Sequence, residues 1–362
     1  MKKPIRPRAG PALVIAAAAC AAGAAHAQSS VQIYGILDAG LQISDTGANG
    51  GERKTELATG NSAGTRLGFR GTEDLGGGLK GVFNLEMGIS NDTGTLLTFG
   101  ESADTVFGRR SVVGLQGGFG EVLLGRDYTP GWQTIFRTDR FRFGLPGTIS
   151  TASGLVVSRA NNGIFYTSPV FGGFRGRLAY TFGAESTRPS DLGRLAGVNL
   201  EYRAGGLYLS AAAQQRRDLV PGSTTQTTSL REWGAGAEYE TGRFGFSGGF
   251  WRANPVTATT GATDASRAVW LGASMKLGAG EVMAQVTRTQ FDVFRRGEGH
   301  ATTAGLAYVY HLSKRTSLYA GLGKVNNDAN SRLALNTGTV RVGGSVFGAD
   351  PRAALVGMRH DF

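Results

Sequence analysis

The chain has 362 residues, with 38 lysines and arginines against 27 aspartates and glutamates, a formal net charge of +11. Only 18% of the residues are charged, and the 58 glycines follow no Gly-X-Y period and come with 10 prolines. This composition argues against an ordinary cytosolic enzyme surface, a disordered polyelectrolyte and a collagen-like fibre, and the single cysteine excludes a disulfide scaffold.

The first 27 residues predict a cleaved secretory signal. Four basic residues open the chain, an apolar stretch follows, and Ala25-His26-Ala27 is a small-x-small cleavage site. Cleavage there leaves 34 basic against 27 acidic residues, a net charge of +7, and removes Cys20. Lipoprotein processing before Cys20 is the alternative, which Ala17 disfavours because leucine usually stands there. Beyond this leader no stretch approaches the roughly 18–20 apolar residues of a membrane-spanning helix.

Period-two alternation begins at Val31 and continues almost throughout the chain. Apolar residues alternate with polar ones over 31–44, again over 79–90, and again over 232–240. Alternation over eight or more residues indicates β-strands with one apolar and one polar face. No segment predicts an amphipathic helix, so the sequence predicts an all-β protein.

The connections between these strands alternate between short and long. Tight glycine-containing or polar turns predict one end of an antiparallel up-and-down sheet, and long polar loops predict the other end. A strand with its share of turn and loop takes about 20 residues, which predicts about 16 strands in residues 28–362. The short turns lie at 117–120, 204–206, 241–243, 277–280 and 311–314, and the long loops at 45–61, 92–103, 127–160, 183–193, 216–229, 254–265 and 326–351.

The two faces of the strands predict opposite surroundings. One face mixes aliphatic residues with alanine, glycine and aromatic residues near strand ends, as in a lipid-facing wall with aromatic girdles. The other face carries charges that need water rather than a dry core. Lipid outside and water inside require a closed transmembrane β-barrel, and alternation up to Phe362 would let the last strand pair with the first. The aromatic residues include Phe69, Phe83, Phe174, Tyr180, Tyr202, Trp233, Tyr239, Phe250, Trp270, Tyr308 and Tyr319; the charged residues are Arg66, Arg70, Glu86, Arg175, Arg177, Glu232, Glu238 and Glu240.

Several motifs in order along the chain resemble one known family. The chain is similar to the general trimeric porins of Gram-negative outer membranes, in particular the β-proteobacterial type. The resemblance implies a 16-stranded barrel, a homotrimer, and a third external loop that folds into the lumen as a constriction. The motifs are residues 31–35 (VQIYG), 65–76 (TRLGFRGTEDLG), 109–115 (RRSVVGL), 119–126 (FGEVLLGR), 162–169 (NGIFYTSP) and the tail 357–362 (GMRHDF).

The segment 127–160 lies where the family's inward-folded loop belongs. It contains hydrophobic and aromatic residues that a freely solvated loop would not need, including Tyr128, Trp132 and Phe136. A loop packed against the barrel wall would use them and would narrow the pore. The alternative is a solvated loop tip, which the residues alone favour.

The resemblance also implies a charged constriction. The family places carboxylates on this loop opposite an arginine cluster on the wall, and Asp139 matches the loop acid. Phe143 stands where a second acid is expected, and Ile36 replaces a wall lysine. Of the neighbouring Arg109 and Arg110, alternation cannot say which faces inward. The basic wall is then Arg66, Arg109 and Arg159, the loop adds Arg137, Arg140 and Arg142, and further lumen candidates are Arg70, Arg126, Arg175 and Arg177.

Other signals carry little weight. The glycine pattern at 76–81 opens a strand rather than a helix, so it does not predict a dinucleotide site. The histidines His300, His311 and His360 lack metal-ligand spacing, and no Ser/His/acid set is evident. The arginines are spread over alternating strands, which disfavours nucleic-acid binding. We expect no cofactor, no metal and no catalysis.

The sequence therefore predicts an outer-membrane porin for passive diffusion of small hydrophilic solutes. A surplus of arginine in the constriction predicts anion selectivity. The expected partners are two further copies in a homotrimer, outer-membrane lipid and lipopolysaccharide, and mainly anionic solutes. A substrate-selective channel for organic acids or phosphate is one alternative, and a non-conducting surface adhesin, β-helix or structural β-protein is the other.

Overall fold

The computed structural model describes residues 30–97, 105–184, 189–220, 223–254, 265–293 and 296–362. The predicted leader lies outside these residues. The strands are β1 (Ser30–Asp45), β2 (Arg53–Thr59), β3 (Arg66–Gly76), β4 (Leu79–Ile89), β5 (Leu96–Leu97), β6 (Arg110–Gly117), β7 (Gly120–Tyr128), β8 (Arg159–Thr167), β9 (Phe174–Thr181), β10 (Leu195–Ala204), β11 (Leu207–Leu219), β12 (Thr227–Thr241), β13 (Phe244–Asn254), β14 (Ala265–Leu277), β15 (Gly280–Val293), β16 (Gly297–His311), β17 (Thr316–Asn327), β18 (Leu335–Thr337), β19 (Val340–Val342) and β20 (Arg352–Asp361). The helices are α2 (Pro130–Thr138) and α3 (Ile149–Ala152).

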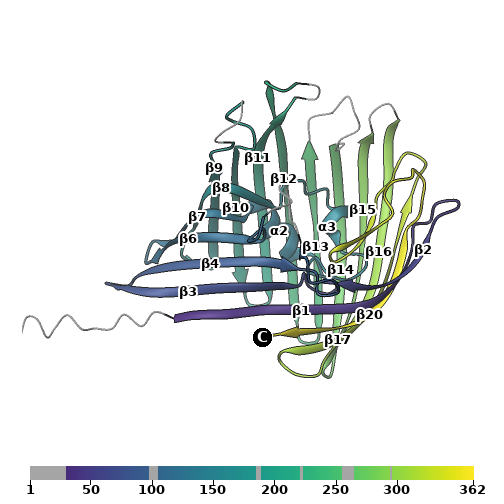
Figure 1. Cartoon of the computed structure of the whole chain (residues 1–362), viewed down its shortest axis with the longest axis horizontal. Coiled ribbons are helices and arrows are strands. Elements are labelled where there is room, and N and C mark those ends of the chain that lie inside the picture. Colours follow the sequence, from purple (N-terminus) through teal and green to yellow (C-terminus); the bar gives the residue numbers. More distant parts are fainter. Residues whose placement is uncertain (1–29, 98–104, 185–188, 221–222, 255–264, 294–295) are drawn as a thin grey trace, which may run out of the picture.

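The strands form a closed antiparallel barrel of 16 strands (Figure 1). Neighbours in the barrel are consecutive from β3 to β17, except that short β5 pairs only with the end of β4, which continues to β6. The strands β18 and β19 form a separate two-stranded sheet. β2 and β3 together make one interrupted strand along the same edge of β1. The barrel closes where β20 pairs with both β17 and β1, in the register Ile36 to Asp361. Phe362 extends this pairing, since its backbone N–H and C=O each bond to Gly35 at 3.1 Å. The predicted fold class is confirmed.

Side-chain exposure is reversed relative to a water-soluble protein. Large apolar residues lie on the outer surface, such as Leu271 with 67% of its area exposed, while polar residues on the same strands face inward and are buried. On β12, Trp233 and Tyr239 point outward, and Glu232 and Glu238 point inward. The alternation read from the sequence therefore predicted which face meets lipid and which meets the lumen.

Two of the predicted outward aromatic residues face inward instead. Trp270 and Tyr319 are almost fully buried, while their neighbours Val269 and Leu318 are exposed outside. The Trp270 indole donates to the Thr138 carbonyl at 3.2 Å, and the Tyr319 hydroxyl donates to Asp38 at 2.5 Å. The polar atoms of both rings therefore form hydrogen bonds inside the barrel, where the third loop and β1 provide acceptors that lipid does not provide.

The connection from β7 to β8 is the third external loop, and it contains α2 and α3. The prediction that no segment is helical was wrong for this loop. The helix α2 packs against the inner wall formed by β10 to β13, as Figure 1 shows. Among the described residues no helix is long and apolar enough to cross a membrane.

Candidate pore constriction

Three arginines gather on the inner wall around one carboxylate and one phenol. Arg109 pairs with Glu86, with Nε 2.6 Å from Oε1, and Arg66 approaches the same oxygen at 3.8 Å. Arg109 and Arg159 both donate to the Tyr128 hydroxyl, at 3.1 and 3.0 Å. The structure thus brings the three predicted wall arginines together. They come from β3, the residue before β6, and β8.

The neighbours Arg109 and Arg110 both point into the barrel. Val113 and Leu115 on β6 are exposed outside, so alternation turns Arg110 inward. Arg110 lies across the strand pair from Glu86 but forms its ion pair with Asp127, at 2.8 Å. Arg109 precedes the first residue of β6, and alternation therefore does not govern its direction. Only the fold could settle this pair.

Of the further lumen candidates, Arg126 lines a second cavity together with Arg159 of this cluster, and the others make their contacts elsewhere. Arg175 and Arg177 line, with Arg110, a cavity of about 470 Å³ between α2 and strands β6 to β9, and Arg177 also pairs with Glu201. Arg70 donates to Gln32 at 2.8 and 2.9 Å. Arg126 donates to the Gly108 carbonyl at 2.8 Å and to Asn161.

The third loop is fixed to the opposite wall by polar and apolar contacts. The Gly131 N–H donates to Gln214 at 2.8 Å, and the Thr134 and Ser210 hydroxyls bond at 2.8 Å. Ile135 and Ile149 are fully buried in an apolar cluster that contains Trp251 and Trp270. The loop therefore narrows the lumen from the side of β10 to β17.

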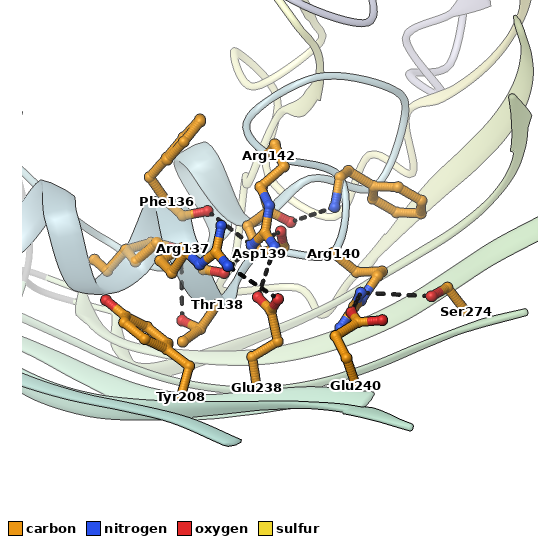
Figure 2. Close-up of polar contacts among 12 residues, drawn as sticks. Phe136, Arg137, Thr138, Asp139, Arg140, Arg142, Tyr208, Glu238, Glu240 and Ser274 are labelled. Carbon is orange, nitrogen blue, oxygen red and sulfur yellow. Dashed lines mark hydrogen bonds and ion pairs between the residues drawn. The ribbon is translucent and has the colours of Figure 1, made fainter. Parts of the chain in front are cut away.

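The loop arginines reach carboxylates of this wall (Figure 2). Arg142 pairs with Glu238 at 2.6 Å, and Arg137 approaches the other oxygen of the same carboxylate at 3.6 Å. Arg140 pairs with Glu240 at 2.7 Å, and only 4% of its side chain is exposed. The three predicted loop cations thus bind the loop to β12, and only Arg137 and Arg142 retain access to the lumen.

Asp139 was expected to face the arginine cluster, but its side chain points elsewhere. Its side chain is fully buried, and its two carboxylate oxygens accept four hydrogen bonds inside the loop and from β15. The donors are Phe141 N (3.1 Å), Phe143 N (2.8 Å), the Thr148 hydroxyl (2.5 Å) and the Gln285 amide (2.8 Å). Asp139 organises the loop instead of lining the pore.

The expected rows of opposite charge are therefore absent from the described constriction. The wall carries Arg66 and Arg109 on Glu86 with Arg159 on the neighbouring Tyr128 hydroxyl, and the loop carries Arg137 and Arg142 on Glu238. Both sides have a surplus of positive charge. This arrangement attracts anions rather than creating a field across the gap.

Comparison with known proteins agrees with this geometry. The profile of the Gram-negative porin family matches residues 12–330. Outer membrane porin protein 32 of Delftia acidovorans is 35% identical over 364 residues, covering 97% of this chain and 99% of the relative. The solved structure of an anion-selective porin from Comamonas acidovorans has a TM-score of 0.81 at 34% identity, covering 92% of this chain and 100% of that one. The trimer form of OmpT from Vibrio cholerae, 16% identical with a TM-score of 0.70, covers 92% of this chain and 99% of its own and shares the fold. The chain therefore belongs to the Gram-negative porin family, and it is a β-barrel porin of the outer membrane.

Proposed function

We propose that this porin lets small hydrophilic solutes diffuse passively across the outer membrane with a preference for anions. Arg66, Arg109 and Arg159 form the selective wall, and Arg137 and Arg142 add positive charge from the loop. The mature chain begins after Ala27, assembles as a homotrimer, and contacts lipid and lipopolysaccharide through its outer face. Diffusion of this kind needs no cofactor and no catalytic residue.

The observation that carries the proposal is the charge balance at the wall. Arg66 and Arg109 share the carboxylate of Glu86, and Arg159 bonds to the Tyr128 hydroxyl beside them, so three guanidinium groups against one carboxylate leave a surplus of two positive charges. In water each charge attracts an anion at about 4 Å by about 1 kcal/mol. Two such charges would concentrate anions roughly 30-fold before screening by salt. The porin from Comamonas acidovorans, which is similar over 92% of this chain, is described as anion-selective and supports this sign.

The test is the reversal potential of single channels in a KCl gradient. We expect the wild type to favour chloride over potassium by a factor on the order of ten at low salt, and less at high salt because of screening. Arg66→Glu should abolish or reverse this preference, since it cancels the surplus at the wall. Lys314→Glu, in the exposed turn after β16, makes the same charge change outside the lumen and should leave it intact. A cation preference of the wild type would overturn the proposal.

The homotrimer is tested separately by the mass of the protein in detergent. Analytical ultracentrifugation of unheated protein should give three chains per particle. A single chain per particle that still conducts would reject the trimer and leave the selectivity proposal standing.

A further inference from the structure

The lumen side of the third loop is unusually aromatic. The loop is described without gaps over residues 130–149, and six of its residues before Ser150 are partly exposed. They are Trp132, Gln133, Phe136, Arg137, Arg142 and Phe143. Three are aromatic and two are arginines, and none is acidic.

The helix α2 explains this distribution. Its buried face, Pro130, Gly131, Thr134, Ile135 and Thr138, packs on the barrel wall. Trp132 and Phe136 lie on the opposite face, one turn apart, and so point to the lumen. The loop is already anchored by its buried face. Adjacent aromatic side chains that face water form a contiguous apolar patch, and such patches mark binding surfaces more often than isolated exposed residues do.

These rings form one continuous row together with Tyr128. Tyr128 stacks on Trp132 with ring centroids 3.8 Å apart, and Trp132 stacks on Phe136 at 4.4 Å. Phe143 meets Phe136 edge to face at 5.5 Å. Because the stacked rings cover each other's faces, a solute in the lumen contacts their edges. Ring edges carry partial positive charge.

One end of the aromatic row reaches the arginine cluster. The Arg159 guanidinium lies 4.4 Å from the centre of the Tyr128 ring, and Arg109 and Arg159 both bond to the Tyr128 hydroxyl. At the other end the Arg142 guanidinium lies 3.5 Å from the Phe136 carbonyl oxygen. A passing solute therefore meets an apolar aromatic surface between two cationic groups.

We propose that this row is a subsite for aromatic carboxylates, which deepens the function proposed above and rests on it. The ring of the solute packs on the edges of Tyr128 and Trp132, and its carboxylate pairs with Arg159. A planar guanidinium binds a carboxylate well, and an aromatic face against ring edges adds attraction that a saturated ring lacks.

The experiment measures block of the single-channel chloride current by added monocarboxylates. Benzoate should block at lower concentration than cyclohexanecarboxylate, and acetate should hardly block. Trp132→Leu keeps an apolar residue at the site and should weaken benzoate block about threefold to tenfold, leaving acetate unchanged. Trp233→Leu, which removes a ring exposed on the outer face, is the matched control and should behave as wild type.

The outcomes separate this inference from the porin proposal. Equal block by benzoate and cyclohexanecarboxylate in an anion-selective wild type overturns the subsite alone. A cation-selective wild type overturns the proposed function and with it the subsite. The comparison of ligands uses the unchanged protein, so the subsite stays testable even where a variant fails to insert.

Discussion

Asp139 shows how one buried carboxylate shapes the lumen surface. Arg142 and Phe143 adopt positive φ angles of 51° and 62°, a backbone conformation that costs free energy for residues other than glycine. The Asp139 carboxylate accepts the N–H of Phe143 and of Phe141, and a Thr148 hydroxyl completes the turn. The turn then presents Arg142 and Phe143 to the lumen.

Asp139→Ala should loosen this turn without preventing barrel formation. Four donors would lose their acceptor, and leaving buried donors unsatisfied costs about 1–3 kcal/mol each. We expect a noisier open-channel current with added conductance substates. Asp74→Ala, which removes a carboxylate bonded to Gly76 N at 2.9 Å in an exposed turn, should not change the noise. A quiet Asp139→Ala channel would show that other contacts hold the turn.

At the residue scale the sequence predicted sites on strands better than sites on the loop. Arg66 follows the alternation of β3, so its inward direction was predictable. Asp139 and Arg140 have no such period, and their burial depends on Gln285 and Glu240, which are 146 and 100 residues away. Motif resemblance gave Asp139 a lumen role because spacing cannot report burial.

At the scale of elements, α2 could have been found from local signals. Thr129 caps the helix, its hydroxyl accepting from Trp132 N at 3.4 Å, and Pro130 follows as the first helical residue. Trp132 and Phe136 have the spacing of one helical face. The signal is short, nine residues inside a chain dominated by period two, and the helix is stabilised mainly by its packing on the wall.

The part of the loop around Pro146 lies against glycines of β16 and β17. A methyl group on Gly305 of β16 would lie 2.2 Å from the Pro146 carbonyl oxygen, and one on Gly323 would lie 2.8 Å from Pro146 Cβ. These glycines allow the loop backbone to lie directly against the strands.

Gly305→Ala should therefore push the loop from the wall into the lumen. We expect single-channel conductance to fall or to become unstable, because the clash is with backbone that cannot rotate away. Gly81→Ala is the control, since its added methyl has no heavy atom nearer than 3.8 Å. Unchanged conductance in Gly305→Ala would mean that the loop does not pack here.

At the scale of the whole molecule, the reversed distribution of polar and apolar residues determines both fold and function. Period-two alternation predicted this distribution because each strand borders lipid on one side and the lumen on the other. The inward segments 130–158 were placed by resemblance, since no pattern of alternation describes a loop. Their contacts are with strands far away in the sequence, such as β15, which no local pattern reports.

The anion preference should be nearly independent of pH between about pH 5 and pH 9, since guanidinium groups stay protonated there. The external loop before β10 should also keep the contacts of Asp191 with Arg217 and Thr227 over this pH range. Hydrogen bonds from Thr227 and Arg217 keep the pKa of the Asp191 carboxyl below its ordinary value of 3.8. These contacts therefore stabilise the folded loop fully above the ordinary pKa of 3.8, and the stabilisation is lost only as the pH falls through the lowered pKa of Asp191. Reversal potentials across this pH range test the prediction, and a change of sign would contradict it.

In this account the side of the third loop that carries Trp132, Phe136, Phe143 and the two arginines Arg137 and Arg142 lines a positively charged pore. The direct measurement is thiol labelling of Phe136→Cys during single-channel recording, because the only native cysteine, Cys20, lies in the predicted leader. We predict that a methanethiosulfonate reagent lowers the conductance, and that an anionic reagent reacts faster than a cationic one of the same size. Val113→Cys, on the lipid-facing side of β6, should show no conductance change. Labelling of Phe136→Cys without effect on the current, or faster reaction with the cationic reagent, would contradict the account.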